Sequence, residues 1–274
     1  MANIIPMAGF GSRFVKHGYQ IPKPLIEVLG EPMVVQVIRR LPASDKWIFL
    51  VRQEHIELYQ LDEIITRELP DAIIVATNSV TTGQATTCLL AQGYVEPDEP
   101  LLIGACDSVC LVDDKEYKNL LDDPSIDCIV WTCTKLERMR QTPHLYGWVR
   151  LAGDTQTIEG ISVKVPISDN SYMDHGIVAT FDFKRSSDCF EAINLMIREK
   201  YMIKGEYYLD AVPIFLQKMN KRSVKFDVNQ LLSWGTPQEL QEFESWREIF
   251  RKGIPHTDKN YTEKEYLYWK EIFE

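Results

Sequence analysis

The residues that could carry out chemistry gather at the start of the chain, in a glycine-rich loop that ends with an arginine. Residues 6–14 read Pro-Met-Ala-Gly-Phe-Gly-Ser-Arg-Phe and come directly after a short apolar run. Gly9 and Gly11 allow backbone N–H groups to approach a ligand closely, and such a loop presents these groups to phosphate. Arg13 adds a forked cation at the same turn. We therefore predict an anion-binding loop here.

A lysine follows ten residues later, as Lys23 in the sequence Pro-Lys-Pro-Leu at residues 22–25. The two prolines restrict the backbone and disfavour a helix on both sides, so the ammonium group is expected to be held in one place. An NAD-binding fingerprint would need a glycine where Phe14 stands, and a Walker loop would need Gly-Lys-Ser/Thr. Neither is present, which indicates a phosphate site of another kind.

A carboxylate, Asp107, follows the apolar run at 100–104. A side chain at the carboxyl end of a parallel strand points into the crevice where α/β sheets bind ligands. Mg²⁺ in proteins takes one or two carboxylates together with phosphate oxygens. Asp107 is therefore the candidate metal ligand, whereas Asp113 and Asp114 are expected to be solvated loop charges.

Charge and composition exclude several classes of protein. The 274 residues carry a net charge of −10, which repels nucleic acids and anionic membranes. Yet the first acidic residue is Glu27, so Arg13, Lys16 and Lys23 lie in an acid-free segment. The sequence lacks an apolar run of membrane-spanning length, the features of a signal peptide and paired cysteines. We expect a cytoplasmic protein with reduced, buried thiols.

The pattern of apolar residues predicts the elements that position these groups. Strands are expected at 3–7, 46–51, 72–75, 100–104 and 128–134, and helices at 33–40, 57–68, 85–91 and 117–121. This alternation is typical of a mostly parallel sheet with helices on both faces. Further strands at 146–151, 158–161 and 175–181 predict a small antiparallel addition, followed by helices at 189–200 and 209–218.

The end of the chain is rich in aromatic residues that recur at helical spacing. Two triplets each share one helical face: Phe243, Trp246 and Phe250, then Tyr266, Trp269 and Phe273. Packing within the chain is the favoured interpretation, and the subunit interface of a homo-oligomer is the alternative.

Taken in order, these motifs resemble those of the sugar-phosphate nucleotidyltransferases, or NDP-sugar pyrophosphorylases. That family opens with Gly-x-Gly-Ser/Thr-Arg followed by Pro-Lys-Pro-Leu. The opening Met-Ala-Gly-x-Gly-Ser-Arg-Phe is most similar to the branch found in capsule and surface-polysaccharide pathways. Further similar segments follow at 83–87, 104–108, 146–149, 162–166, 206–209 and 234–240.

The resemblance implies a three-layer, Rossmann-like nucleotidyltransferase fold with a mixed, mostly parallel central sheet and a small antiparallel acceptor-binding lobe. Residues 1–240 would form the nucleotidyltransferase domain, with an NTP-binding half at 1–140 and an acceptor-binding half at 141–240. Residues 241–274 would be a helical extension. The implied reaction joins an NTP to a phosphorylated acceptor, foremost a sugar 1-phosphate, with Mg²⁺ as cofactor and pyrophosphate as the second product.

The resemblance also implies roles for individual residues. The expected catalytic residues are Arg13, Lys23 and Lys164. The expected nucleotide-binding residues are Ala8, Gly9, Gly11, Ser12, Gly83 and Gln84. The acceptor is expected to meet Tyr146, Gly147, Lys164, Gly176 and Glu206, and the metal to meet Asp107.

The chain departs from the family pattern at two positions. Ser233 stands where better-known members have a second aspartate, so either one carboxylate holds the metal or another acid such as Asp227 substitutes. Val163 replaces the glutamate of a Glu-Lys-Pro motif, which favours a rival activity, a cytidylyltransferase acting on a phospho-alcohol or phospho-amine. A GT-A-like glycosyltransferase and a non-catalytic nucleotide-binding module are the alternatives from other classes. His175, beside Gly176, is interpreted as a local packing or hydrogen-bonding residue.

Overall fold

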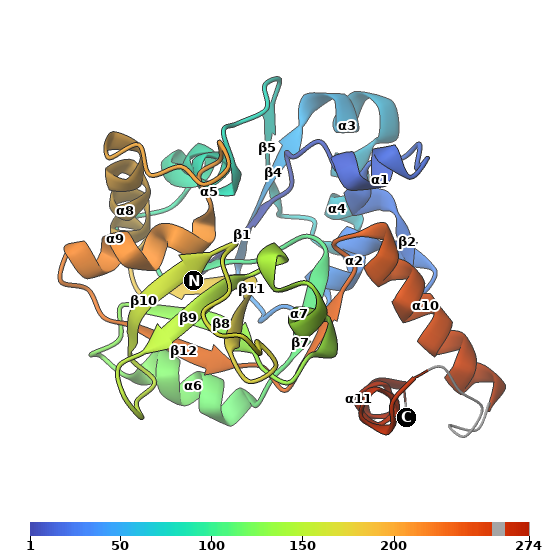
Figure 1. Ribbon diagram of the computed structural model, residues 1–274. Coiled ribbons are helices and arrows are strands. Elements are labelled where there is room, and N and C mark those ends of the chain that lie inside the picture. The colour runs from blue at the N-terminus through green and yellow to red at the C-terminus, as the bar shows by residue number, and fades with distance from the viewer. Residues whose placement is uncertain (254–260, 274) are drawn as a thin grey trace.

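The computed structural model describes residues 1–253 and 261–273, which fold around one large mixed sheet (Figure 1). Within these residues the sheet has nine strands. From one edge, the order is β5 (Ile73–Thr77), β4 (Lys46–Arg52), β1 (Ala2–Pro6), β6 (Leu101–Ile103), β11 (His175–Phe183), β8 (Cys128–Cys133) and β12 (Ser223–Asp227). β9 (Gly147–Leu151) and β10 (Ile158–Val163) branch from β11. β5, β4, β1 and β6 are parallel neighbours, whereas β11 runs antiparallel to β6 and β8.

The central strands are buried on both faces. Successive side chains of a strand point to opposite sides, so Ile4 and Ile5 of β1 enter different apolar clusters. Ile48 and Phe49 of β4 divide in the same way. A parallel sheet that is buried on both faces is covered by helices on each side. The helices in both clusters confirm the predicted three-layer α/β class.

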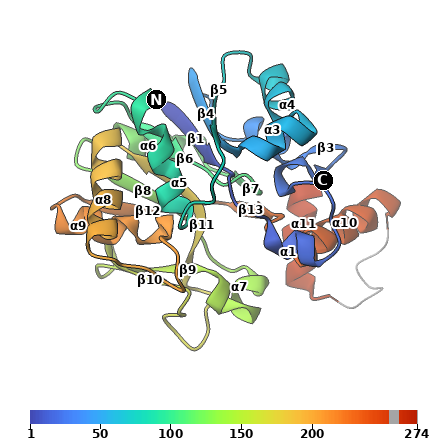
Figure 2. The same ribbon diagram turned by 90° about the horizontal axis from the view of Figure 1, so that it is seen from above.

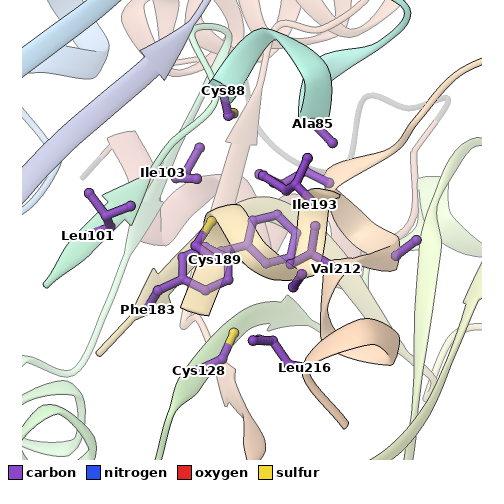
Figure 3. Close-up of a cluster of buried hydrophobic side chains, with 14 of the residues drawn as sticks. Ala85, Cys88, Leu101, Ile103, Cys128, Phe183, Cys189, Ile193, Val212 and Leu216 are labelled. Atoms are coloured by element: carbon purple, nitrogen blue, oxygen red, sulfur yellow. The ribbon is translucent and has the colours of Figure 1, made fainter. Parts of the chain in front are cut away.

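Helices form the two outer layers (Figures 1 and 2). One apolar cluster joins the sheet to α5 (Gln84–Cys88), α8 (Ser186–Arg198) and α9 (Val212–Lys218). Figure 3 shows this cluster, in which Cys88, Cys189 and Leu216 meet side chains of the sheet. The second cluster joins the sheet to α2 (Met33–Ile38), α4 (Leu61–Glu68), α10 (Pro237–Lys252) and α11 (Glu263–Phe273). α6 (Asp114–Asp122) belongs to a third cluster with β8 and β12.

Shorter elements complete the chain. The α-helices are α1 (Ser12–Lys16), α3 (Gln53–Tyr59) and α7 (Glu137–Gln141), and the 3₁₀ turns are Lys23–Leu25, Leu89–Tyr94, Pro143–Leu145 and Leu209–Ala211. β2 (Glu27–Val28) pairs with β3 (Glu31–Pro32). β7 (Ser108–Leu111) pairs with β13 (Gln230–Ser233).

The predicted antiparallel addition is present, but its third strand has a larger role than expected. β9 and β10 form an antiparallel pair, and the first two residues of β11 pair antiparallel with β9. The last three residues of β11 pair with β6, and β8 runs along its other side. β11 is therefore a central strand of the main sheet as well as part of the addition.

One local expectation was wrong and another was incomplete, because Asp113 is exposed as expected but also has a structural role. The helix expected at 57–68 is divided into α3 and α4, because Gln60 adopts a left-handed conformation with φ of 53°. Asp113 is not a free loop charge, since its Oδ1 accepts hydrogen bonds from the backbone N–H groups of Lys115 (2.9 Å) and Glu116 (3.0 Å). It therefore caps the start of α6.

The C-terminal aromatic residues pack against one another within the chain. The Trp246 and Trp269 rings stack at 6.1 Å, and Phe250 stacks on Tyr266 at 5.2 Å. The interpretation as a packing stripe between two helices is confirmed. All six cysteines are free, as expected. Among the described residues, no helix has the length and apolar character needed to cross a membrane.

A buried carboxylate in the core makes stability depend on pH. Asp182 accepts hydrogen bonds from the Tyr117 hydroxyl and the Trp131 indole, both at 2.7 Å. Burial raises the pKa of Asp182 to about 7, although both hydrogen bonds oppose this. An unfolded aspartate titrates near 3.9, so between about pH 4 and pH 7 only the folded state keeps the proton. Stability must then fall as pH rises, by up to about 1.4 kcal/mol per pH unit.

We expect Asp182→Asn to flatten this dependence. The variant cannot ionise, so its free energy of unfolding should fall less between about pH 4.5 and 7 than that of the wild type. Urea unfolding at several pH values measures this. The exposed Asp154→Asn is the control and should keep the wild-type slope. Equal slopes for wild type and Asp182→Asn would contradict the prediction.

Candidate active site

A cavity of about 320 Å³ opens at the carboxyl ends of β1 and β6. Its wall includes the glycine loop at 9–13, Lys23, Cys106, Glu206 and Gly235, which come from distant parts of the chain. The carboxyl edge of parallel strands is where α/β sheets bind ligands. Four predicted nucleotide or phosphate residues, Gly9, Gly11, Ser12 and Arg13, line this cavity.

The glycine loop is fixed at both ends. The Met7 N–H donates to the Leu50 carbonyl of β4 at 2.9 Å, and the Phe14 side chain is buried. Gly11 has φ of 60° and begins α1, a left-handed conformation that favours glycine. Ala8, the other predicted nucleotide-binding residue of the loop, is 3% exposed and is not among the described residues that line the cavity. Arg13 is exposed at the rim.

Lys23 is held in place by two oxygen atoms. Its ammonium forms an ion pair with Asp107 and donates to the Gly235 carbonyl at 3.1 Å. Burial opposes the charge, but Asp107 outweighs it and raises the pKa of Lys23 above its ordinary value. Arg13 lies close enough to oppose that rise. The lysine that the sequence placed between two prolines is therefore a positioned cation.

Asp107 lies between β6 and β7, and its surroundings fit a divalent cation. A Cβ on Gly235 would lie 3.3 Å from Asp107 Oδ2, 3.0 Å from Glu239 Oε2 and 3.6 Å from Ser233 Oγ. Oxygen atoms of three side chains therefore crowd around this point, which only glycine leaves free of a side-chain atom. Carboxylate and hydroxyl oxygens suit Mg²⁺. The described part of the chain contains no cluster of three or more His, Cys, Asp or Glu side chains that could hold a metal.

Asp227 does not belong to this set of oxygen atoms. Its carboxylate contacts His175 Nδ1 at 2.8 Å and accepts from Thr132 Oγ1 at 2.7 Å, and it also pairs with Lys225. Burial raises its pKa, but these hydrogen bonds prevail and hold the pKa of Asp227 at about 2. The carboxylate is already satisfied, so the hypothesis that it replaces the missing aspartate was wrong. The hydrogen-bonding interpretation of His175 is confirmed.

Lys164 provides a third cation, on the side of the antiparallel addition. Its backbone N–H donates to the Tyr146 carbonyl at 2.9 Å, and its ammonium donates to the Leu145 carbonyl. Burial lowers the pKa of Lys164; Asp210 opposes this, and the nearby Arg13 adds to it. Arg13 therefore acts electrostatically on both Lys23 and Lys164, although Lys164 is not among the described residues that line the cavity.

Gly83 and Gln84 lie on a loop tied to the segment of Glu206. Gly83 has φ of 121°, and a Cβ there would lie 2.6 Å from the Tyr207 backbone N and O. The Tyr207 N–H donates to the Thr82 carbonyl at 2.8 Å. Only glycine allows the two backbones to approach so closely. Gln84, the first residue of α5, is half-buried, and its side chain has no hydrogen-bond partner among the described residues.

The structure does not bring three predicted acceptor residues to the cavity wall. A Cβ on Gly176 would lie 2.6 Å from Met139 Sδ, so Gly176 packs beneath Met139. Gly147 packs against the Asp210 carboxylate in the same way. The Tyr146 hydroxyl accepts a hydrogen bond from Arg138 Nε at 3.2 Å. Of these three, Tyr146 contacts Lys164, through the hydrogen bond that its backbone carbonyl accepts.

Two carboxylates near the site are not among the residues predicted from the sequence. Asp210 is 8% exposed and acts electrostatically on Lys164. The sequence signal for Asp210 was its position directly after residues 206–209, a segment that resembles the nucleotidyltransferase family. Glu239 borders the space beside Gly235, but its spacing from Thr236 is that of an ordinary helix-capping residue.

Comparison with known proteins identifies the fold. No family model and no curated protein matches the sequence. A nucleoside-diphosphate-sugar pyrophosphorylase from Vibrio cholerae RC9 is 19% identical with a TM-score of 0.70, over 88% of this chain and 98% of that one. An inositol-1-phosphate CTP transferase from T. maritima is 15% identical with a TM-score of 0.67, over 99% of this chain and 95% of that one.

A third solved structure is HddC from Yersinia pseudotuberculosis complexed with GMP-PN. It is 16% identical with a TM-score of 0.62, over 88% of this chain and 96% of that one. At these identities the likeness establishes the fold. The chain has the α/β nucleotidyltransferase fold, with a mixed, mostly parallel central sheet, as the motifs predicted.

Proposed function

We propose that the protein is a nucleotidyltransferase that joins an NTP to a phosphorylated acceptor and releases pyrophosphate. The observation that carries this proposal is the cavity at the carboxyl edge of the sheet, which Arg13, Lys23 and the glycine loop line and where Lys23 pairs with Asp107. Two polyanions that must react need a concentration of positive charge. A chain with a net charge of −10 provides it locally, in the acid-free segment and in Lys164.

The reaction requires little covalent work from the protein. An oxygen of the acceptor phosphate forms a bond to the α-phosphorus, and the bond from that phosphorus to the bridging oxygen breaks. Pyrophosphate leaves with the electron pair. The acceptor phosphate is already anionic near neutral pH, so catalysis consists of positioning and charge stabilisation. This agrees with the cavity wall, which has no histidine among residues 1–253 and 261–273.

Each cation has a separate task in this proposal. The amides of Gly9 to Ser12 and the Arg13 guanidinium bind the departing pyrophosphate. Lys23 stabilises the α-phosphoryl group, and Lys164 holds the acceptor phosphate. The loop at 83–84 and the Ala8 backbone meet the base, where Gln84 offers both a donor and an acceptor.

Mg²⁺ is the cofactor that these oxygen atoms fit. Asp107 would hold the ion beside Gly235, where the Ser233 hydroxyl also approaches. When bound, Mg²⁺ supplies charge neutralisation between phosphate oxygens.

The acceptor is foremost a sugar 1-phosphate, as in capsule and surface-polysaccharide synthesis. Glu206 lines the cavity close to Lys164 and is the candidate partner of acceptor hydroxyls. One observation favours a rival, a CTP-dependent enzyme for a non-sugar phosphate. Val163 is buried at 6% exposure where the motif has a glutamate, so no carboxylate reaches the acceptor from that position.

A matrix of substrates tests the proposal. Each of the four NTPs is combined with glucose 1-phosphate, mannose 1-phosphate, inositol 1-phosphate and phosphoethanolamine in the presence of Mg²⁺, and pyrophosphate release is measured. We expect release with one base and a sugar 1-phosphate. Release with CTP and a non-sugar phosphate would support the rival activity. No release with any pair, together with binding of an NDP-sugar but no NTP, would indicate a glycosyltransferase instead.

A further inference from the structure

The departure at Ser233 leaves the metal site with one aspartate where the motif has two. β13 and β7 pair in register, so Ser233 lies opposite Ser108, next to Asp107. The Trp234 N–H donates to the Asp107 carbonyl at 2.8 Å and fixes this approach. A short hydroxyl therefore occupies the position from which a carboxylate would reach the ion.

A carboxylate approaches the same space from the next helix. Glu239 lies in the first turn of α10 and is 8% exposed. Its Oε2 would be 3.0 Å from a Cβ on Gly235, and Asp107 Oδ2 would be 3.3 Å from that same point. The two carboxylate oxygens therefore lie around one point that only glycine at position 235 leaves free, and Asp107 Oδ2 also accepts from the Lys23 ammonium there.

Helix capping does not account for the orientation of Glu239. In a capping box, the threonine side chain accepts from the backbone three residues later, and the glutamate returns a bond to the threonine N–H. The first bond is present, with the Glu239 N–H donating to Thr236 Oγ1 at 3.2 Å. The return bond is not formed among the described residues, because the carboxylate turns toward Gly235 and Arg138.

One oxygen of Glu239 remains available. Arg138 Nε lies 3.3 Å from Oε1 and also donates to the Tyr146 hydroxyl. Oε2 receives no hydrogen bond from residues 1–253 or 261–273. An unpaired carboxylate oxygen on a side chain this buried is costly unless a cation or donor joins it.

We propose that Glu239 supplies the second carboxylate of the Mg²⁺ site, together with Asp107, in place of the aspartate missing at Ser233. This inference rests on the proposed function, because that function gives the ion its task. Arg138 limits the repulsion between the two carboxylates by pairing with the far oxygen of Glu239.

Direct binding of Mn²⁺ tests the inference without an activity measurement. The full chain is titrated with Mn²⁺ alone, and free Mn²⁺ is followed by electron paramagnetic resonance. Glu239→Gln is expected to weaken binding by at least about tenfold, because it removes a charged ligand. Glu242→Gln is the matched control: Glu242 Oε2 also lies 3.3 Å from Arg138, on the same helix. It should change the affinity less than twofold.

A rescue experiment separates ligation from a general disturbance of the fold. Adding Ser233→Asp to Glu239→Gln should restore Mn²⁺ binding, and the melting temperature of each variant reports folding. Wild-type affinity in Glu239→Gln, equal losses in both glutamine variants, or no Mn²⁺ binding by the wild type would each overturn the inference. If Glu239-dependent Mn²⁺ binding is found but no substrate pair releases pyrophosphate, the proposed function fails and the metal site stands. If instead a substrate pair releases pyrophosphate but Mn²⁺ binding is unchanged in Glu239→Gln, the proposed function stands and Glu239 is not a ligand of the metal.

Discussion

Replacing Lys23 with alanine is expected to lower kcat for pyrophosphate release by about 10²–10³-fold, the usual cost of losing one positioned charge-stabilising donor. The ammonium is fixed by Asp107 and by the Gly235 carbonyl, so it is already oriented before substrate binds. Its pKa is raised, so it stays protonated throughout the neutral range. No other lysine of the acid-free segment lines the cavity, and the lost charge has no substitute among the described lysines. A coupled pyrophosphate assay at saturating substrates measures kcat.

Lys16→Ala is the matched control for this variant. Lys16 lies in the same basic segment, but it is exposed on α1 and does not line the cavity. It should keep kcat within about twofold of the wild type. Melting temperatures of both variants check that the fold is kept. A Lys23→Ala enzyme with near wild-type turnover would remove the central cation from the mechanism.

Asp107→Asn is expected to remove Mg²⁺-dependent turnover, with a loss of about 10³-fold. Asparagine keeps the size of the side chain but loses the charge that recruits the ion. It also leaves Lys23 without its ion-pair partner, so the lysine pKa should fall. Turnover is measured against Mg²⁺ concentration, and Mn²⁺ binding is measured in parallel. Loss of turnover with unchanged Mn²⁺ affinity would show that Asp107 acts through Lys23 rather than on the metal.

The control for this charge change is Asp114→Asn. Asp114 is exposed in the first turn of α6. Its neighbour Asp113 caps that helix, so a substitution of Asp113 would disturb folding. Asp114→Asn should leave both turnover and Mg²⁺ dependence unchanged. An active Asp107→Asn enzyme with the wild-type Mg²⁺ requirement would refute the metal assignment.

Much of the fold follows from local patterns that the sequence displays openly. Apolar runs such as those around Ile4 and Ile48 can only be strands buried on both sides, and they predict a covered parallel sheet. Asp107 could be assigned to the ligand edge because the end of a buried strand has a known place in this architecture. Gly9, Gly11 and Arg13 could be assigned for the same reason.

Contacts across the fold could not be predicted in this way. Lys23 and Asp107 are 84 residues apart, and their ion pair depends on how two loops approach each other. Glu239 has the spacing of a capping residue, and only the structure shows that its carboxylate turns toward Gly235. Gln60 divides a helix through a left-handed backbone conformation that no apolar periodicity signals. Gly176 could be taken for a ligand contact because sequence does not show the Met139 side chain above it.

The double role of β11 constrains how the enzyme could move. Its first residues pair with β9 of the antiparallel addition, and its last residues pair with β6 beside the glycine loop. A rigid-body rotation of one half against the other would have to break the hydrogen bonds between β11 and its neighbouring strands. Any closing motion over bound substrates is therefore confined to the connecting loops, such as the segments around Gly83 and Glu206, while the sheet remains a fixed frame.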